Sequence, residues 1–322
     1  MFGICMVGSG GIATEHLKAF EKIGGVRPRW VVSRLEDQAL KFARAWKFDK
    51  AGIHFEESLS DDQVDLVVIA SPSELHARQT LAALRAGKDV IVEIPVGLNL
   101  AEAEEVARCA RELGRRVLVC HTMRSFPAVR EARRRAQAGE LHITQVQGFF
   151  AIPRRRNQSW AGQRHWIDNL LWHHGCHQVD AALWVLGARE VQQVSAVVGK
   201  AHPQFGMAMD VALVFRTASH QIVSHSLTYN TEQFHWELRF IGDEDVLTFR
   251  EARCLDESNQ PVAPEVEIRD LTAQNSQMLA ALRDDKPSDY DVDEVLPAMR
   301  VLHQAQKAAE EPPMPRSGTP EG

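Results

Sequence analysis

The sequence predicts an α/β domain with a doubly wound parallel sheet, followed by an α+β domain with a large, mostly antiparallel open sheet. In the first third of the chain, short apolar runs alternate with amphipathic segments, a pattern typical of a parallel sheet covered by helices on both faces. After about residue 122, β-forming runs follow one another with few helices between them, which indicates antiparallel pairing. A length of 322 residues also favours two domains over one core.

The first domain is expected to span residues 1–122. Its buried strands are expected at FGICMVG, RWVVS, VDLVVIAS, KDVIVEIP and RRVLVCH. Amphipathic helices are expected at GIATEHLKAFEKI, LEDQALKFARAWK, ELHARQTLAALRAG and AEAEEVARCARELG. Regular alternation of these two kinds of segment predicts a nucleotide-binding sheet.

The second domain is expected over residues 123–309, as a substrate and oligomerisation domain. A basic helix, REARRRAQAGE, opens it, and a helix over about 292–310 closes it. Its strands are expected at TQVQGFFAI, VQQVSAVVG, MDVALVFRT, QIVSHSLTY, HWELRFIG and VLTFR. Residues 310–322 are rich in proline, glycine and charge, so we expect a disordered tail.

Composition narrows the class of protein. A formal net charge of −6 argues against nucleic acid as a partner, because phosphate binding needs a basic surface. Five scattered cysteines, without a CxxC pair, favour a reducing cytoplasm over a disulfide framework. The apolar start MFGICMVGSGG lacks a basic leader, and no apolar run is long enough for a bilayer, so no membrane partner is expected.

A glycine turn follows the first strand. Gly8, Gly10 and Ala13 form a GxGxxA pattern that opens a helix. Gly8 permits the tight turn, Gly10 lets the backbone approach a pyrophosphate, and Ala13 allows close packing of helix on sheet. The N–H groups of Gly11 and Ile12 and the helix dipole favour phosphate. In this context the pattern predicts a dinucleotide cofactor.

The end of the second strand indicates which dinucleotide is bound. NAD-binding domains usually carry an acid there for the ribose 2′-hydroxyl, but this chain has Ser33 and Arg34. An arginine can pair with a 2′-phosphate, so we expect NADP, with NAD possible as a weaker cofactor. The alternative is that Arg34 is simply a solvated residue before the next helix.

The carboxyl ends of the later strands are expected to surround the nicotinamide. Ser71 and Pro72 follow the third predicted strand, and Glu93 and His121 follow the next two. His76 belongs to this group, although it could equally be a residue on the face of the following helix.

Together these motifs resemble the Gfo/Idh/MocA oxidoreductase family. The GxGxxA turn, SPSELH, VEIP and HQVD stand in family order, and the resemblance covers nearly the whole chain. It implies a Rossmann domain followed by an open antiparallel sheet, and an NAD(P)-dependent dehydrogenase acting on CH–OH groups. It also implies a homodimer or higher homo-oligomer formed through that sheet. The family's lysine in the E-K-P motif is Ile94 here, which cannot carry a proton.

The stretch LLWHHGCHQVD stands where the family has D-x-G-x-H-x-x-D. The resemblance places His173 at the aspartate and His177 at the histidine, with Asp180 as the last acid. In a helix His173 and His177 share one face. We expect His177 to accept the substrate's hydroxyl proton and His173 to relay that proton or polarise the hydroxyl. Asp180 is expected to accept a hydrogen bond from one ring nitrogen of His177 and so fix its tautomer. A zinc site and hydrogen-bonded core histidines remain alternatives, and no metal is expected.

The substrate is suggested by a narrower resemblance. VEIP, CHTMR, RHWIDNLLWHH and HPQFGMAMD look like a branch that oxidises the lactol form of a dicarboxylated semialdehyde to a lactone in aromatic degradation. A small anionic cyclic or semialdehyde substrate is therefore expected. Arg124 and Arg164 are expected to clamp its carboxylates, beside His173, and Asp168 to orient them, while Arg154–Arg156 stay open candidates. A sugar or inositol-like polyol dehydrogenase and a non-catalytic NADP-binding regulator are the alternative functions.

Overall fold

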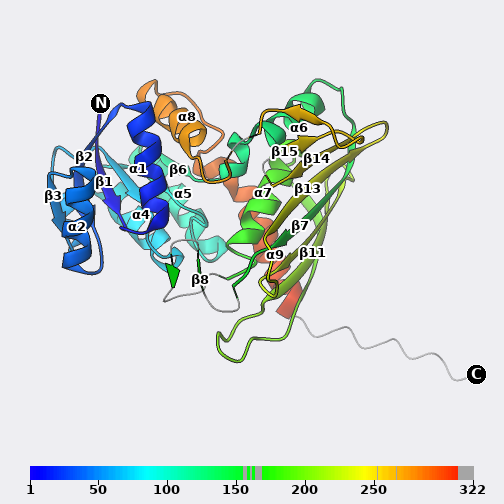
Figure 1. Ribbon diagram of the computed structural model, residues 1–322, viewed down its shortest axis with the longest axis horizontal. Helices are drawn as coiled ribbons and strands as arrows, with labels where there is room; N and C mark the ends of the chain where they lie inside the picture. Colours follow the sequence, from blue (N-terminus) through cyan, green and yellow to red (C-terminus); the bar gives the residue numbers. More distant parts are fainter. Residues whose placement is uncertain (155–157, 160–161, 164–168, 252, 266, 311–322) are drawn as a thin grey trace, which may run out of the picture.

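Two β-sheets lie side by side in the computed structural model, and helices fill the space between them (Figure 1). The structure describes residues 1–310 apart from 155–157, 160–161, 164–168, 252 and 266. The predicted order, a parallel sheet followed by a mostly antiparallel one, is confirmed. No helix in the described part of the chain has the length and apolar content needed to cross a bilayer.

The first sheet consists of parallel strands in the order β3-β2-β1-β4-β5-β6. These strands are β1 (Phe2–Val7), β2 (Val26–Val32), β3 (Lys50–Gly52), β4 (Leu66–Ile69), β5 (Asp89–Val92) and β6 (Val117–Val119). The direction of winding reverses between β1 and β4. Open parallel sheets bind ligands at such a switch point, beyond the carboxyl ends of the strands.

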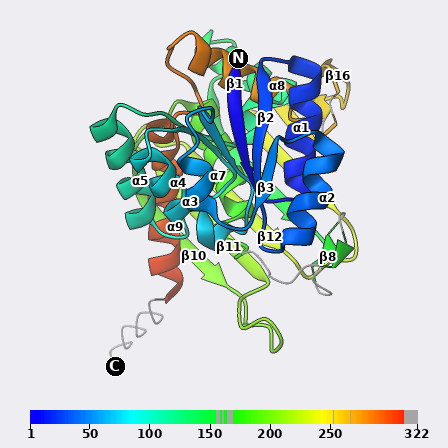
Figure 2. The same cartoon turned by 90° about the vertical axis from the view of Figure 1, so that its left-hand side faces the viewer.

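Helices cover both faces of this sheet (Figure 2). Helices α1 (Gly11–Ile23) and α2 (Glu36–Trp46) lie on one side, and α4 (His76–Arg85) and α5 (Leu100–Leu113) on the other. The short α3 (Phe55–Leu59) and the 3₁₀ turn η1 (Ser73–Leu75) complete the connections. Strand residues such as Ile4, Val67 and Ile91 are fully buried, as expected for a sheet covered twice.

The second sheet has the order β10-β11-β12-β7-β13-β14-β15-β16, and its pairs are antiparallel except for β12 with β7. Its strands are β7 (Ile143–Ala151), β10 (Val191–Val198), β11 (Asp210–Thr217), β12 (Ile222–Thr228), β13 (His235–Gly242), β14 (Val246–Arg250), β15 (Arg253–Leu255) and β16 (Pro261–Ala263). A separate pair, β8 (Gln158–Ser159) and β9 (Gly162–Gln163), follows β7.

One face of the second sheet packs on helices and the other lies open. Helices α6 (Pro127–Gln137), α7 (His174–Leu186) and α9 (Val292–Glu310) lie on the side of the first domain (Figure 1). Along β11, Val211, Leu213 and Phe215 are buried, while Ala212 and Val214 are exposed. This two-residue period is that of a sheet covered on one face only.

The C-terminal segment returns to the first domain. Helix α8 (Thr272–Arg283) packs against α1, and the backbone of Tyr290 accepts a hydrogen bond from Val119 of β6 at 2.8 Å. Arg116 and Asp291 form a bidentate ion pair beside this contact. Residues assigned by sequence to the second domain therefore cover the first sheet.

The longer predicted elements are confirmed, including α1 and α9 at their predicted bounds. The short β3, β15 and β16 were not predicted, because three-residue strands carry too little pattern. Helix α8 was not predicted either, since two of its buried positions are the polar Gln274 and Asn275. The predicted disordered tail lies, apart from Glu310, outside the described residues.

Candidate active site

The glycine turn between β1 and α1 fits a dinucleotide. Gly8 has φ +114°, and a Cβ there would lie 2.4 Å from the carbonyl oxygen of Ala70, so only glycine is tolerated. Space around Gly10 is open, since a Cβ there would meet no atom within 4 Å. Helix α1 begins at Gly11 with no side-chain cap and no acid in its first turn. Its N–H groups, those of Gly11 and Ile12 first, are therefore available to phosphate oxygens.

The end of β2 lies against this turn. The hydroxyl oxygens of Ser9 and Ser33 are 2.8 Å apart, so the residue that usually carries an acid is instead tied to the glycine turn. The next side chain, Arg34, is exposed. An exposed guanidinium at this position can meet a phosphate.

The carboxyl ends of β4 and β5 are joined through His76. Its ring nitrogens lie 2.8 Å from the carbonyl oxygen of Pro95 and 2.9 Å from that of Ser71, and the ring is buried. His76 therefore braces the loops that follow β4 and β5, and the structure favours this role over direct cofactor binding. Ser71 and Pro72 stay half-buried at the end of β4, with the Ser71 hydroxyl donating to Gln79.

Glu93 ends β5 beside a buried histidine. His16 Nε2 lies 2.8 Å from Glu93 Oε1, and His16 Nδ1 lies 3.0 Å from the Asn275 side-chain amide. Glu93 keeps 14% of its side chain exposed, whereas His16 has none. His16 and Asn275 were not among the residues expected at the site. The only signal was a histidine on the buried face of α1, since Asn275 is 259 residues away.

Ile94, which replaces the family's lysine, is only 2% exposed and packs in the main hydrophobic core. Its side chain therefore takes no part in polar chemistry.

Asp180 on α7 forms a fully buried ion-pair network. Its carboxylate receives Arg124 Nε at 2.8 Å and Nη2 at 2.5 Å, and lies 3.2 Å from His121 Nδ1. Burial raises the pKa of Asp180, but Arg124 and His121 outweigh this and hold it below its usual range. Arg124 also donates to the carbonyl oxygens of Asp289 and Glu294.

This network changes the expected roles of its members. The Arg124 guanidinium is 2% exposed and committed to protein oxygens, so the structure favours a structural role over the expected substrate clamp. His121 is 1% exposed, between Asp180 and the Cys176 thiol at 3.9 Å, and is not directed at a cofactor by any hydrogen bond in the described chain. Asp180 contacts His121 rather than fixing the tautomer of His177 as expected.

The histidines of α7 divide into two groups. His174 is buried, stacks on Phe150 and shares a hydrogen bond with the Tyr229 hydroxyl at 2.8 Å, so it is a core histidine. His173 and His177 are half-buried and lie one turn apart where α7 begins, His173 being its N-cap.

His177 is kept neutral. Burial, with the neighbouring His121 and His173, lowers its pKa to about 3, and Glu93 and Asp180 offset this only in part. Its Nδ1 has no hydrogen-bond partner among the described residues. That nitrogen is buried, so the half-buried ring would meet a substrate through another part of its edge. A neutral imidazole can accept a proton, although it is a weaker base than the ordinary pKa of about 6.5 would give.

Arg154–Arg156, Arg164 and Asp168 are the remaining expected site residues. Arg155, Arg156, Arg164 and Asp168 lie outside the described residues, and Arg154 is buried after β7. The group of described residues close enough to share a metal ion is His16, Glu93 and Cys120, and it includes neither His173 nor His177.

The fold and the site define a dinucleotide-dependent oxidoreductase, with a phosphate-binding turn at the switch point and acid–base groups above the strand ends. Residues 2–121 match the family described as "Oxidoreductase family, NAD-binding Rossmann fold", and residues 127–266 match "Bacterial oxidoreductases, C-terminal". The chain therefore belongs to the Gfo/Idh/MocA oxidoreductase family, and it is an NAD(P)-dependent dehydrogenase.

Individual relatives agree with this assignment. The chain is 32% identical over 306 residues to 4-carboxy-2-hydroxymuconate-6-semialdehyde dehydrogenase of Sphingobium sp. (strain NBRC 103272 / SYK-6), covering 93% of this chain and 96% of the relative. It is 30% identical to scyllo-inositol 2-dehydrogenase (NAD(+)) of Bacillus subtilis (strain 168), over 42% of this chain and 40% of the relative.

Solved structures share the fold. A levoglucosan dehydrogenase in complex with NADH and L-sorbose superposes with a TM-score of 0.83 at 16% identity, over 96% of both chains. GenD2 from gentamicin A biosynthesis, in complex with NAD, has a TM-score of 0.83 at 23% identity, over 96% of this chain and 94% of that one.

The buried network predicts a large stability effect. Asp180→Asn keeps the shape of the side chain but leaves the buried Arg124 without its counter-charge, so we expect the free energy of unfolding to fall by about 3–5 kcal/mol. Urea unfolding at neutral pH measures this. Asp284→Asn, which removes an exposed ion pair with Arg283, is the control and should leave stability unchanged.

The pH dependence gives a second readout of the same change. The pKa of Asp180 is lower in the folded state, so its contribution is complete above the unfolded value of about 3.9 and is lost as pH falls through the folded value. The stability gap between wild type and Asp180→Asn should narrow as the pH falls below about 4. A gap that is small at neutral pH, or constant on acidification, contradicts the assignment.

Proposed function

We propose that this dehydrogenase oxidises the lactol form of 4-carboxy-2-hydroxymuconate-6-semialdehyde to 2-pyrone-4,6-dicarboxylate with NADP, as a step in the degradation of aromatic compounds. The observation on which the proposal depends is the set of groups available to accept a proton. A buried isoleucine stands where the family has its lysine, and two half-buried histidines lie where α7 begins. Similarity along nearly the whole chain to the Sphingobium enzyme supports the same substrate.

A weak base suits a lactol. The ring oxygen withdraws electrons from the lactol carbon, so its hydroxyl is more acidic than that of a simple alcohol. The imidazole of His177 would accept that proton, and His173 would relay it or polarise the hydroxyl from the adjoining turn. The two carboxylates of the substrate would raise the pKa of both imidazoles through their negative charge.

The cofactor, when bound, supplies the hydride acceptor. The open glycine turn holds its pyrophosphate, and Ser33 and Arg34 would hold the 2′-phosphate. Arg164 and Asp168 remain the sequence-based candidates for the substrate carboxylates.

A sugar or polyol dehydrogenase is the second candidate. It is favoured by the partial similarity to the inositol dehydrogenase and by the shared fold of levoglucosan dehydrogenase. The buried Ile94 argues against it, because an unactivated alcohol needs a stronger base than a lactol.

Turnover tests the function directly. With NADP and a panel of lactols, semialdehydes, sugars and polyols, we expect NADPH absorbance to rise with the dicarboxylated lactol. His177→Ala should lower kcat by about 10²–10⁴-fold and leave cofactor binding intact, because a general base is lost. His142→Ala, at an exposed histidine, is the control. Turnover of polyols alone would select the second candidate, and cofactor binding without any turnover a regulator.

Cofactor preference depends on Arg34. A charge-assisted contact to a 2′-phosphate favours NADP about tenfold to a hundredfold, so Arg34→Ala should lower the NADP/NAD ratio of kcat/KM by that factor. Arg44→Ala, at an exposed arginine further along α2, serves as the matched control. An unchanged ratio in Arg34→Ala would remove the assignment.

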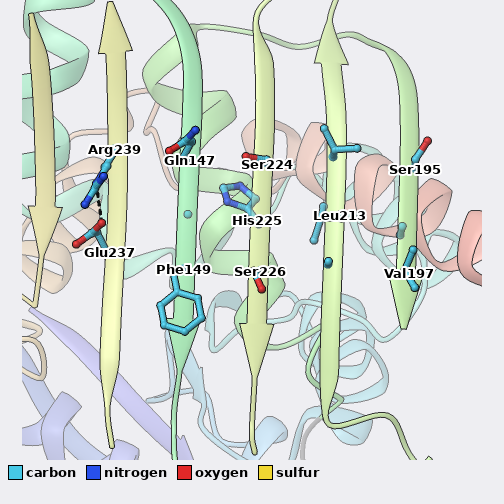
Figure 3. A pocket seen from close by; sticks show the side chains of 14 residues that line it. Gln147, Phe149, Ser195, Val197, Leu213, Ser224, His225, Ser226, Glu237 and Arg239 are labelled. Atoms are coloured by element: carbon cyan, nitrogen blue, oxygen red, sulfur yellow. Dashed lines mark ion pairs between the residues drawn. The ribbon is translucent and has the colours of Figure 1, made fainter. Parts of the chain in front are cut away.

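The open sheet face is proposed as the interface between two copies of the chain. A pocket lies on this face, and Figure 3 shows the side chains of Phe149 on β7, Ser226 on β12 and Val197 on β10 that line it. Phe149 is 41% exposed, Val197 72% and Val214 42%, an apolar surface that a monomer would leave in water. A second copy of the same face would cover it.

A charge placed on this face should separate the copies. We expect Val197→Lys to lower the mass measured by light scattering to that of a single chain. Leu113→Lys, at a 45% exposed leucine on α5, should not change the mass. A wild-type chain that is monomeric at micromolar concentration contradicts the interface.

A further inference from the structure

A chain of buried hydrogen bonds runs from α8 to the carboxylate at the end of β5. Gln274 Nε2 donates to Asn275 Oδ1 at 3.4 Å, which turns the amide nitrogen of Asn275 toward His16. His16 then stands 2.8 Å from Glu93 Oε1. Gln274, Asn275 and His16 have no exposed surface.

The hydrogen-bonding capacities of Asn275 and Glu93 determine which ring nitrogen of His16 carries the proton. An amide nitrogen only donates, so Asn275 requires His16 Nδ1 to accept. The single proton of the neutral imidazole is then on Nε2, where it is donated to Glu93. This leaves His16 neutral and Glu93 with the negative charge.

Four groups face Glu93 from the surrounding elements: His16 of α1, His76 of α4, His177 of α7 and the Cys120 thiol after β6. Burial raises the pKa of Glu93, but the neutral His16 ring donates a hydrogen bond to its carboxylate, which lowers that pKa. Burial raises the pKa of Cys120 well above its usual value, so the thiol is neutral. Glu93 is therefore the charged member of the cluster at neutral pH.

We propose that Glu93 is the fixed negative charge of the active site and that His16 and Asn275 are positioning residues that hold its carboxylate. The lysine that normally follows this glutamate is absent, so no neighbouring cation in the motif neutralises it. A carboxylate here favours the oxidised cofactor, whose ring is cationic, over the neutral reduced form. It also favours a proton on His177. This inference rests on the proposed site of oxidation.

The first test needs no substrate or cofactor. Nitrogen-15 NMR of the wild-type protein at neutral pH should show His16 protonated on Nε2 alone. Asn275→Asp, whose carboxylate accepts where the amide donated, should protonate both nitrogens, because each would then face a carboxylate. Asn275→Leu should leave the proton on Nε2, because Glu93 still accepts it. Protonation of wild-type His16 on Nδ1, or on both nitrogens, would overturn the relay.

The second test measures cofactor binding without turnover. Glu93→Gln keeps the shape and removes the charge, so the ratio of Kd values should shift about tenfold against the oxidised cofactor. Glu93→Asp should restore part of the wild-type ratio. Cys120→Ala removes the uncharged neighbour and should leave the ratio unchanged. A wild-type ratio in Glu93→Gln would overturn the charge assignment.

Neither measurement uses a substrate, so its result is separate from that of the turnover assay. Failure of the lactol assay with a confirmed His16 tautomer and a shifted binding ratio would remove the proposed substrate and keep the role of Glu93.

Discussion

The buried carboxylate of Asp180 is the constraint on which the active site depends. It belongs to α7 in the second domain, yet its partners Arg124 and His121 follow β6 in the first. Arg124 also donates hydrogen bonds to the backbone carbonyls of Asp289 and Glu294, in the C-terminal part of the chain. An ion pair without solvent is stable only with close geometry and full hydrogen bonding, so it permits one arrangement of α7 on the strand ends. That arrangement sets where His173 and His177 stand.

Burial influences which groups around the site carry a charge. Arg124 neutralises Asp180, and His177 remains neutral because desolvation lowers its pKa. Glu93 alone keeps a net charge in the cluster below α7, held by a hydrogen bond rather than by a cation. The replacement of the family's lysine by Ile94 therefore changes the net charge of the proposed site. A lysine would place a cation beside the substrate, whereas here the carboxylate of Glu93 is the charge beside the cofactor.

How far the sequence predicts this protein depends on the range of each signal. Apolar runs and helical spacing are local, so α1 and α9 could be placed within a residue, and GxGxxA located the cofactor turn. Contacts between residues far apart in the sequence leave no such local signal. Arg124 looked like a substrate clamp because its partner Asp180 lies 56 residues away, and Asn275 gave no signal at all. His174 and His177 carry the same ring three residues apart, and only packing separates the core histidine from the site histidine.

The weakness of the base and the choice of substrate support one another. His177 is a weak base, because its desolvation and the neighbouring His121 and His173 all lower its pKa. Under the proposed function, such a base suits a substrate whose hydroxyl is already acidic, or whose own charge strengthens the base. A dicarboxylated lactol has both properties, while a neutral polyol has neither. The electrostatics around His177 therefore support the proposed lactol over a neutral sugar.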